Sequence, residues 1–120
     1  MQKTMNIKRG YSKYRVAPVA DRTIDGHIFA SKREMNRYLE LKLLQRAGEI
    51  KDLKLQPKFI LLPPLKEHKA ITYRPDFIYH DVKANKLIVE EVKGFATREY
   101  KIKAHLFEHL YPQYEYLVTK

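Results

Sequence analysis

The sequence predicts an α/β (α+β) fold, in which a mixed central sheet is flanked by helices in the order α-β-β-β-α-β. Two segments space their apolar residues as amphipathic helices do and are bounded by capping residues. Other segments are short, rich in β-branched and aromatic residues, and bounded by prolines or polar turns. The 120 residues are 44% apolar, which suffices for one domain with a modest core.

The first helix is expected from Ser31 to about Ala47. Ser31 and Glu34 have the spacing of a capping box, and Gly48 is a typical left-handed stop. Its apolar positions fall in two adjacent rows, which are Met35, Leu39 and Leu43, and Tyr38 and Leu41. Glu34 lies one turn before the second row, at the border of the packed face. On spacing alone, the capping role is the preferred interpretation of Glu34.

The second helix is expected from Thr97, as its N-cap, to about Tyr111-Pro112. Its apolar stripe consists of Tyr100, Ala104, Phe107 and Tyr111, while Lys101, His105 and Glu108 point away. Lys103 falls among the apolar positions. Its side chain therefore either extends to water or faces something anionic beside the sheet.

The strands are expected at 53–62, 73–79, 87–93 and 114–118. Pro57 interrupts the first, which predicts an edge strand or two short pieces with a bulge. The second and third form a hairpin over residues 70–93, with a polar turn at 81–85 and apolar residues on both faces. A short strand or hairpin turned at Asp25-Gly26 is expected at 23–29.

The long hairpin carries the chemically most informative residues. If its turn is centred between Lys83 and Ala84, Asp76 lies directly opposite Glu91. Facing like charges are destabilising, and a bound divalent cation would remove that penalty. Lys93 lies two residues beyond Glu91 and shares its face of the sheet. The pattern predicts an acidic metal site with a lysine beside it, and Glu90, on the other face, is interpreted as structural.

The net charge of +10 and the pI near 9.7 predict a polyanionic partner, most simply nucleic acid. A generic basic surface or an anionic-membrane binder would show the same charge. Residues 1–22 are interpreted as a basic arm that mixes cationic residues with tyrosines, or else as a terminus that packs on the core. No signal peptide or membrane span is expected, and the absence of cysteine excludes disulfides and thiolate metal sites.

Five histidines, at 27, 68, 80, 105 and 109, lack the spacing of a zinc motif. His105 and His109 lie one helical turn apart and leave weak metal binding as an alternative. We interpret the histidines as ordinary residues.

Pro75-Asp76, followed by Glu91-Val92-Lys93, matches the signature of the PD-(D/E)XK nuclease superfamily, and the element order is similar to that of its core. Over residues 23–111 the chain more closely resembles small phage and prophage endonucleases related to Holliday-junction resolvases. The resemblance is carried by Ile24-Asp25-Gly26, Phe29, Ser31-Lys32, Glu34, 47–50, 55–59, Asp76-Phe77 and 92–95. The sequence departs from that family at Ala30, where an acidic or amide residue is expected, and at Glu91, where aspartate is common.

The resemblance implies that residues 23–120 form a single nuclease domain with a restriction-endonuclease-like core. It implies that Asp76 and Glu91 bind Mg²⁺ or Mn²⁺ with the Val92 carbonyl, and that Lys93 activates the attacking water. Glu34 would reach the metal directly or through water, and Gln56 would line the site. Nearness to that site suggests a set of DNA-binding residues, which are Lys32, Arg33, Arg74, Lys101 and Lys103.

The expected activity is a metal-dependent endonuclease that cuts branched DNA such as Holliday junctions. It would act as a homodimer, without a small-molecule cofactor or a membrane, in the cytoplasm of a bacterial host that carries the phage or prophage. The alternatives are a monomeric nicking or mismatch-directed nuclease and a catalytically silent nucleic-acid-binding module.

Overall fold

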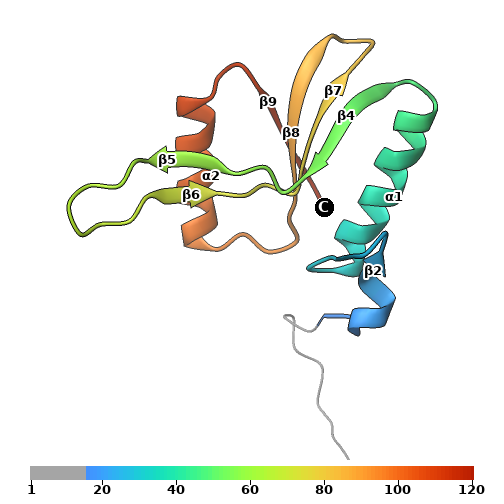
Figure 1. Cartoon of the computed structure of the whole chain (residues 1–120), viewed down its shortest axis with the longest axis horizontal. Coiled ribbons are helices and arrows are strands. Elements are labelled where there is room, and N and C mark those ends of the chain that lie inside the picture. Colours follow the sequence, from blue (N-terminus) through green and yellow to red (C-terminus); the bar gives the residue numbers. More distant parts are fainter. Residues whose placement is uncertain (1–15) are drawn as a thin grey trace, which may run out of the picture. The chain divides into compact units, whose positions relative to one another are not determined.

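The structure, a computed structural model, describes residues 16–120 (Figure 1). The chain divides into two units, Met1–Asn36 and Arg37–Lys120, and each is described by itself. Most of the predicted basic arm, including Tyr11 and Tyr14, lies outside the described residues. None of the helices in the described part is long and apolar enough to cross a membrane.

The first unit begins its described part with a 3-10 helix, η1 (Val19–Arg22), followed by the strands β2 (Thr23–Ile24) and β3 (His27–Ile28). The two strands pair antiparallel around the predicted turn. Asp25 and Gly26 have φ values of 54° and 75°, which a two-residue hairpin turn of this hand requires. Arg22, at the end of the predicted arm, donates hydrogen bonds to the carbonyls of Ala17 and Phe29. This part of the arm is thus folded against its own chain.

Helix α1 (Lys32–Arg46) begins and ends where its capping residues predict. The Ser31 hydroxyl accepts the backbone N–H of Glu34 at 3.0 Å, so Ser31 is the N-cap. At the other end, Gly48 has a φ of 81°, and two backbone hydrogen bonds close a Schellman motif around it. Tyr38 and Leu41 are buried, whereas Leu43 is 62% exposed. The row that contains Tyr38 is therefore the packed one.

A four-stranded mixed sheet forms the centre of the second unit. Its strands are β4 (Ile50–Leu55), β7 (Phe77–Asp81), β8 (Lys86–Val92) and β9 (Glu115–Thr119), in the order β4-β7-β8-β9. The first two pairs are antiparallel and β8 pairs with β9 in parallel. Helix α2 (Arg98–Leu110) connects β8 to β9, as a parallel pair requires a crossover. Its N-cap is Thr97, whose hydroxyl accepts the Tyr100 N–H at 3.1 Å.

Two of the predicted strands are each divided in the structure, at a proline. Pro57 separates β4 from β5 (Phe59–Leu62), as predicted, and Pro75 separates β6 (Ile71–Tyr73) from β7, which was not predicted. β5 and β6 pair with each other in a separate two-stranded sheet that lies beside α2 (Figure 1). Because proline has no N–H to donate to a ladder, the chain changes partners at each of these points.

Both faces of the central sheet are covered, as the apolar pattern predicts. On one face, Tyr38 of α1 stacks on Phe77 with ring centroids 6.5 Å apart. On the other, Val89 and Phe107 are fully buried in a cluster that α2, β5 and β6 complete. Phe59 meets Phe107 edge to face at 4.8 Å in that cluster. Tyr73 belongs to this aromatic cluster and also lines the candidate site described below.

Candidate functional site

The register of the β7–β8 hairpin agrees with the predicted one. Phe77 pairs with Glu90 and Ile78 with Val89, and the same register holds along the hairpin to its turn. Continued by one residue beyond β7, this register sets Asp76 opposite Glu91. The Asp76 carboxylate accepts the backbone N–H of Val92 through Oδ2 at 2.7 Å. Asp76 is thus held beside the strand segment that carries Glu91 and Lys93.

Glu91 and Lys93 lie together on the face that α2 covers. Glu91 is 6% exposed, and its Oε2 lies 3.3 Å from Nζ of Lys93. The Lys93 ammonium also sits over the ring of Tyr100, 4.5 Å from its centroid. The backbone N–H of Lys93 donates to the Thr119 carbonyl at 2.8 Å, which ties this residue to the end of β9. Strand pairing and ring contact therefore fix Lys93 from both ends.

Three tyrosine hydroxyls form a chain that ends on Glu91. Tyr73 donates to Glu91 Oε1 at 2.5 Å, the hydroxyls of Tyr73 and Tyr116 are 2.6 Å apart, and those of Tyr116 and Tyr100 are 2.7 Å apart. Because Tyr73 has one proton and gives it to the carboxylate, Tyr116 must donate to Tyr73 and Tyr100 to Tyr116. Aligned hydrogen bonds of this kind strengthen one another in a low-dielectric interior.

Burial raises the pKa values of all three phenols. Burial raises the pKa of Tyr73 well above its ordinary value, and the hydrogen bond to Glu91 raises it further. Burial also raises the pKa of Tyr100, with added contributions from the negative charges of Glu91, Glu108 and Asp76. These three tyrosines could not be grouped from the sequence, because they come from β6, α2 and β9 and share no local spacing.

A cavity of about 340 Å³ opens over this cluster. Cationic side chains predominate around it, since Arg74, Lys93 and Lys103 line it together with two carboxylates. The remaining lining residues are Tyr73, Glu91, Thr97, Glu99 and Tyr100. Lys103 forms an ion pair with Glu99 at 3.2 Å, so the anion it faces belongs to its own helix.

The other predicted site residues are less closely connected to the cavity. Gln56 has a φ of 49° and donates its backbone N–H to the Asp76 carbonyl at 2.9 Å, while its side chain is exposed. Lys101 is exposed and does not line the cavity. Lys32 and Arg33 are exposed residues of the first unit. Glu34, also in that unit, is 4% exposed, and its role at a metal stays a prediction.

Glu90 faces the opposite side of the sheet, as predicted, in a closed ion-pair network. Nε and Nη2 of Arg37 donate to its two oxygens at 2.6 and 3.1 Å. Tyr79 and Thr119 add hydroxyl donors at 2.6 and 3.1 Å. The hydrogen bond to Glu90 raises the pKa of Arg37. Glu90 thus anchors α1 to the sheet.

The donor set suits a hard divalent cation, since Asp76, Glu91 and the Val92 carbonyl offer only oxygen. Within the described residues, no cluster of three or more histidine, cysteine, aspartate or glutamate side chains could hold a metal. Mg²⁺ commonly takes one or two carboxylates and completes its shell with water and substrate phosphate. Two carboxylates therefore meet the minimum that this ion requires.

Comparison with known proteins gives one family. No curated protein and no solved structure matches the chain. Residues 11–120 match a family described as "Protein of unknown function (DUF1064)". Because the match spans nearly the whole sequence, including every element of the site described above, the chain belongs to the DUF1064 family.

Proposed function

We propose that the chain is a metal-dependent endonuclease that hydrolyses phosphodiester bonds in DNA, with branched DNA as its substrate. The observation that carries the proposal is the Asp76 carboxylate bound to the Val92 N–H, between Glu91 and Lys93 in sequence. This hydrogen bond holds Asp76 beside Glu91 and Lys93, and the last two line one cationic cavity. The hairpin, followed by a helix and a parallel strand, is the arrangement expected of a PD-(D/E)XK core with a restriction-endonuclease-like fold.

The chemistry of the residues fits hydrolysis of a phosphodiester. Asp76 and Glu91, with the Val92 carbonyl, would hold Mg²⁺ or Mn²⁺, which acidifies bound water and neutralises charge on the phosphoryl oxygens. Lys93, whose Nζ lies 3.3 Å from Glu91 Oε2, would orient the attacking water and stabilise the charge that develops at phosphorus. Arg74 and Lys103, across the cavity, would hold the flanking phosphates.

The same contacts also support a second hypothesis. An ion pair such as Glu91–Lys93 also occurs in proteins that only bind nucleic acid, and the basic charge suits either role. The chain would then be a DNA-binding module that does not cut. Only a cleavage assay separates the two.

The decisive experiment compares Asp76→Asn with Asp81→Asn on plasmid and four-way-junction DNA. Asp81 is the last residue of β7, the strand that follows Asp76, and its Oδ1 accepts the Ala84 N–H within the hairpin turn, away from the cavity. With Mg²⁺ or Mn²⁺, the parent and Asp81→Asn are expected to cut, whereas Asp76→Asn is expected to lose cleavage and keep DNA binding in EDTA. Cleavage by Asp76→Asn at the parent rate would refute the site. Absence of cleavage by the parent, with tight binding, would favour the binding module.

A resolvase cuts two strands symmetrically, so the proposal includes a two-fold dimer. Sedimentation of the free protein and of its junction complex measures this directly. A complex with one chain per junction would favour the nicking alternative.

A further inference from the structure

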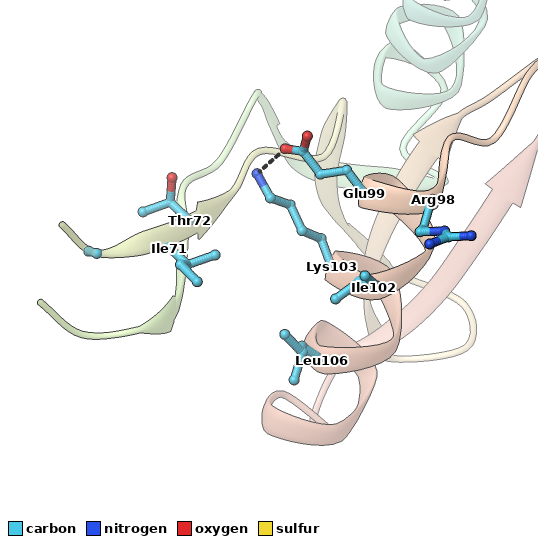
Figure 2. A pocket seen from close by; sticks show the side chains of 8 residues that line it. Ile71, Thr72, Arg98, Glu99, Ile102, Lys103 and Leu106 are labelled. Carbon is cyan, nitrogen blue, oxygen red and sulfur yellow. Dashed lines mark ion pairs between the residues drawn. The ribbon is translucent and has the colours of Figure 1, made fainter. Parts of the chain in front are cut away.

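A second, apolar groove adjoins the cationic cavity. It has a volume of about 610 Å³ and lies between β6 and α2 (Figure 2). One wall is formed by residues 70–72 of the β6 segment, and the other by Arg98, Glu99, Ile102, Lys103 and Leu106. Figure 2 shows Ile71 on the strand side and Ile102 and Leu106 on the helix side. All three are substantially exposed, at 41%, 55% and 37%.

The groove and the cavity share a border. Glu99 and Lys103 line both, and their ion pair stands between them. Tyr100 lines the cavity and Leu106 lines the groove, and Leu106 lies six positions further along the helix, a rise of about 9 Å. Neighbouring phosphates of one DNA strand are roughly 3.4 Å apart along the axis in a duplex and further apart in an extended strand. At the duplex spacing about three nucleotides cover this distance, and fewer do so in an extended strand.

We propose that this groove receives an unpaired nucleobase of the DNA strand whose phosphate lies in the adjoining cavity. The inference rests on the proposed function and adds the feature that the substrate must have. Aliphatic side chains cannot hold phosphate, but they pack well against the flat, apolar face of a base. The charged rim of the groove consists of Arg98, Glu99 and Lys103, and Lys103 is paired with Glu99, so Arg98 would be the rim cation that contacts the sugar-phosphate backbone.

The substrate class follows from the geometry of DNA. A paired base lies inside the helical stack and can enter a pocket only after it is extruded, which costs least where pairing is already interrupted. The groove therefore selects DNA with an unpaired base beside the bound phosphate, as at a branch, a bulge or a flap.

The test uses the full chain in EDTA and two short duplexes, one with a central unpaired 2-aminopurine and one with the same base paired. The parent is expected to bind the bulged duplex about ten-fold more tightly than the paired one, the scale of one base contact. The fluorescence of 2-aminopurine in the bulged duplex should rise when the parent binds, because an aliphatic groove does not quench an unstacked base.

Two variants alter opposite walls of the groove, and a third is the matched control. Ile102→Gln and Ile71→Thr keep the helix- and strand-forming tendencies of their positions. Leu110→Gln changes another exposed apolar residue of α2, 46% exposed, that does not line the groove. The first two should reduce the preference for the bulge to near one without weakening binding to paired duplex. The control should keep the preference.

Several results would overturn the proposal. An equal affinity of the parent for both duplexes is one, and an undiminished preference in the folded Ile102→Gln and Ile71→Thr variants is another. If the parent sediments as a dimer that Ile102→Gln dissociates, with the bulge preference intact, the groove is instead a contact between copies. Cleavage without bulge preference refutes the groove alone, and bulge preference without cleavage refutes the nuclease alone.

Discussion

Replacing Tyr73 with phenylalanine removes one hydroxyl and leaves the ring in the core. That hydroxyl donates to Glu91 Oε1 at 2.5 Å, and Glu91 is 6% exposed. Loss of a hydrogen bond to a buried charged group costs about 2 kcal/mol of unfolding free energy. For a domain of this size, that loss lowers Tm by about 8 °C. Thermal unfolding followed by circular dichroism measures it.

Stability alone would not distinguish a site residue from a core residue, so a matched variant is needed. Tyr79→Phe removes a hydroxyl that donates to Glu90 at 2.6 Å, on the other face of the same sheet. Both variants should lose similar stability. Only Tyr73→Phe should raise the Mn²⁺ concentration that gives half-maximal cleavage, by about 10–100-fold, because a group that orients a metal ligand typically contributes that much.

The reasoning would be refuted if Tyr73→Phe, folded at the assay temperature, needed the same Mn²⁺ concentration as the parent to within two-fold. It would also be refuted if Tyr79→Phe shifted the metal dependence as strongly. Calorimetric titration of Mn²⁺ into each protein compares their metal affinities without DNA. This comparison applies even if the protein binds DNA without cutting it.

Three further predictions concern the fold. Arg37→Leu leaves Glu90 charged and buried without its cation and should lower the free energy of unfolding, measured in urea, by about 3–5 kcal/mol. Glu40→Gln removes the exposed partner of Arg37 and should lower the free energy of unfolding by less than about 1 kcal/mol. Gly48→Ala should cost about 1 kcal/mol because φ is 81° there, although no atom lies within 4 Å of the added Cβ; an unchanged urea midpoint would contradict this. Buried phenols such as Tyr73 keep their protons in the folded protein, whereas the unfolded chain releases them near pH 10. The free energy of unfolding should therefore be highest below about pH 10 and fall above it. A urea midpoint that does not change between about pH 9 and 11 would be inconsistent with burial of these phenols.

The parts of the fold that sequence reasoning predicts are those specified locally. Ser31 and Gly48 bound α1 because capping depends on residues within one turn. The hairpin register is equally local, since the length and centre of its turn align every pair that follows. For that reason the position of Asp76 opposite Glu91 could be predicted from the sequence.

The parts that were missed depend on partners distant in sequence. Pro75 ends one strand, but only the pairing of β6 with β5 shows that the chain then enters a second sheet. The contact from Tyr73 to Glu91 follows from that change of sheet. A strand continued straight through Pro75, as the residue pattern predicts, would not bring the Tyr73 phenol beneath the carboxylate. The tyrosine chain is thus a product of tertiary structure.

Adjacent glutamates on β8 illustrate how one strand supplies both an anchor and a candidate metal ligand. Glu90 has four donors, two from Arg37 and one each from Tyr79 and Thr119, and a carboxylate has about four lone-pair sites. A divalent cation there would have to displace them and would add charge to a site that a guanidinium already neutralises. Glu91 has a neutral phenol on one oxygen and, on the other, the lysine that directly follows its strand, and it lines a cavity. The strand's alternation sends the two carboxylates to opposite faces, and the difference in their donors makes Glu91 the one suited to bind an ion.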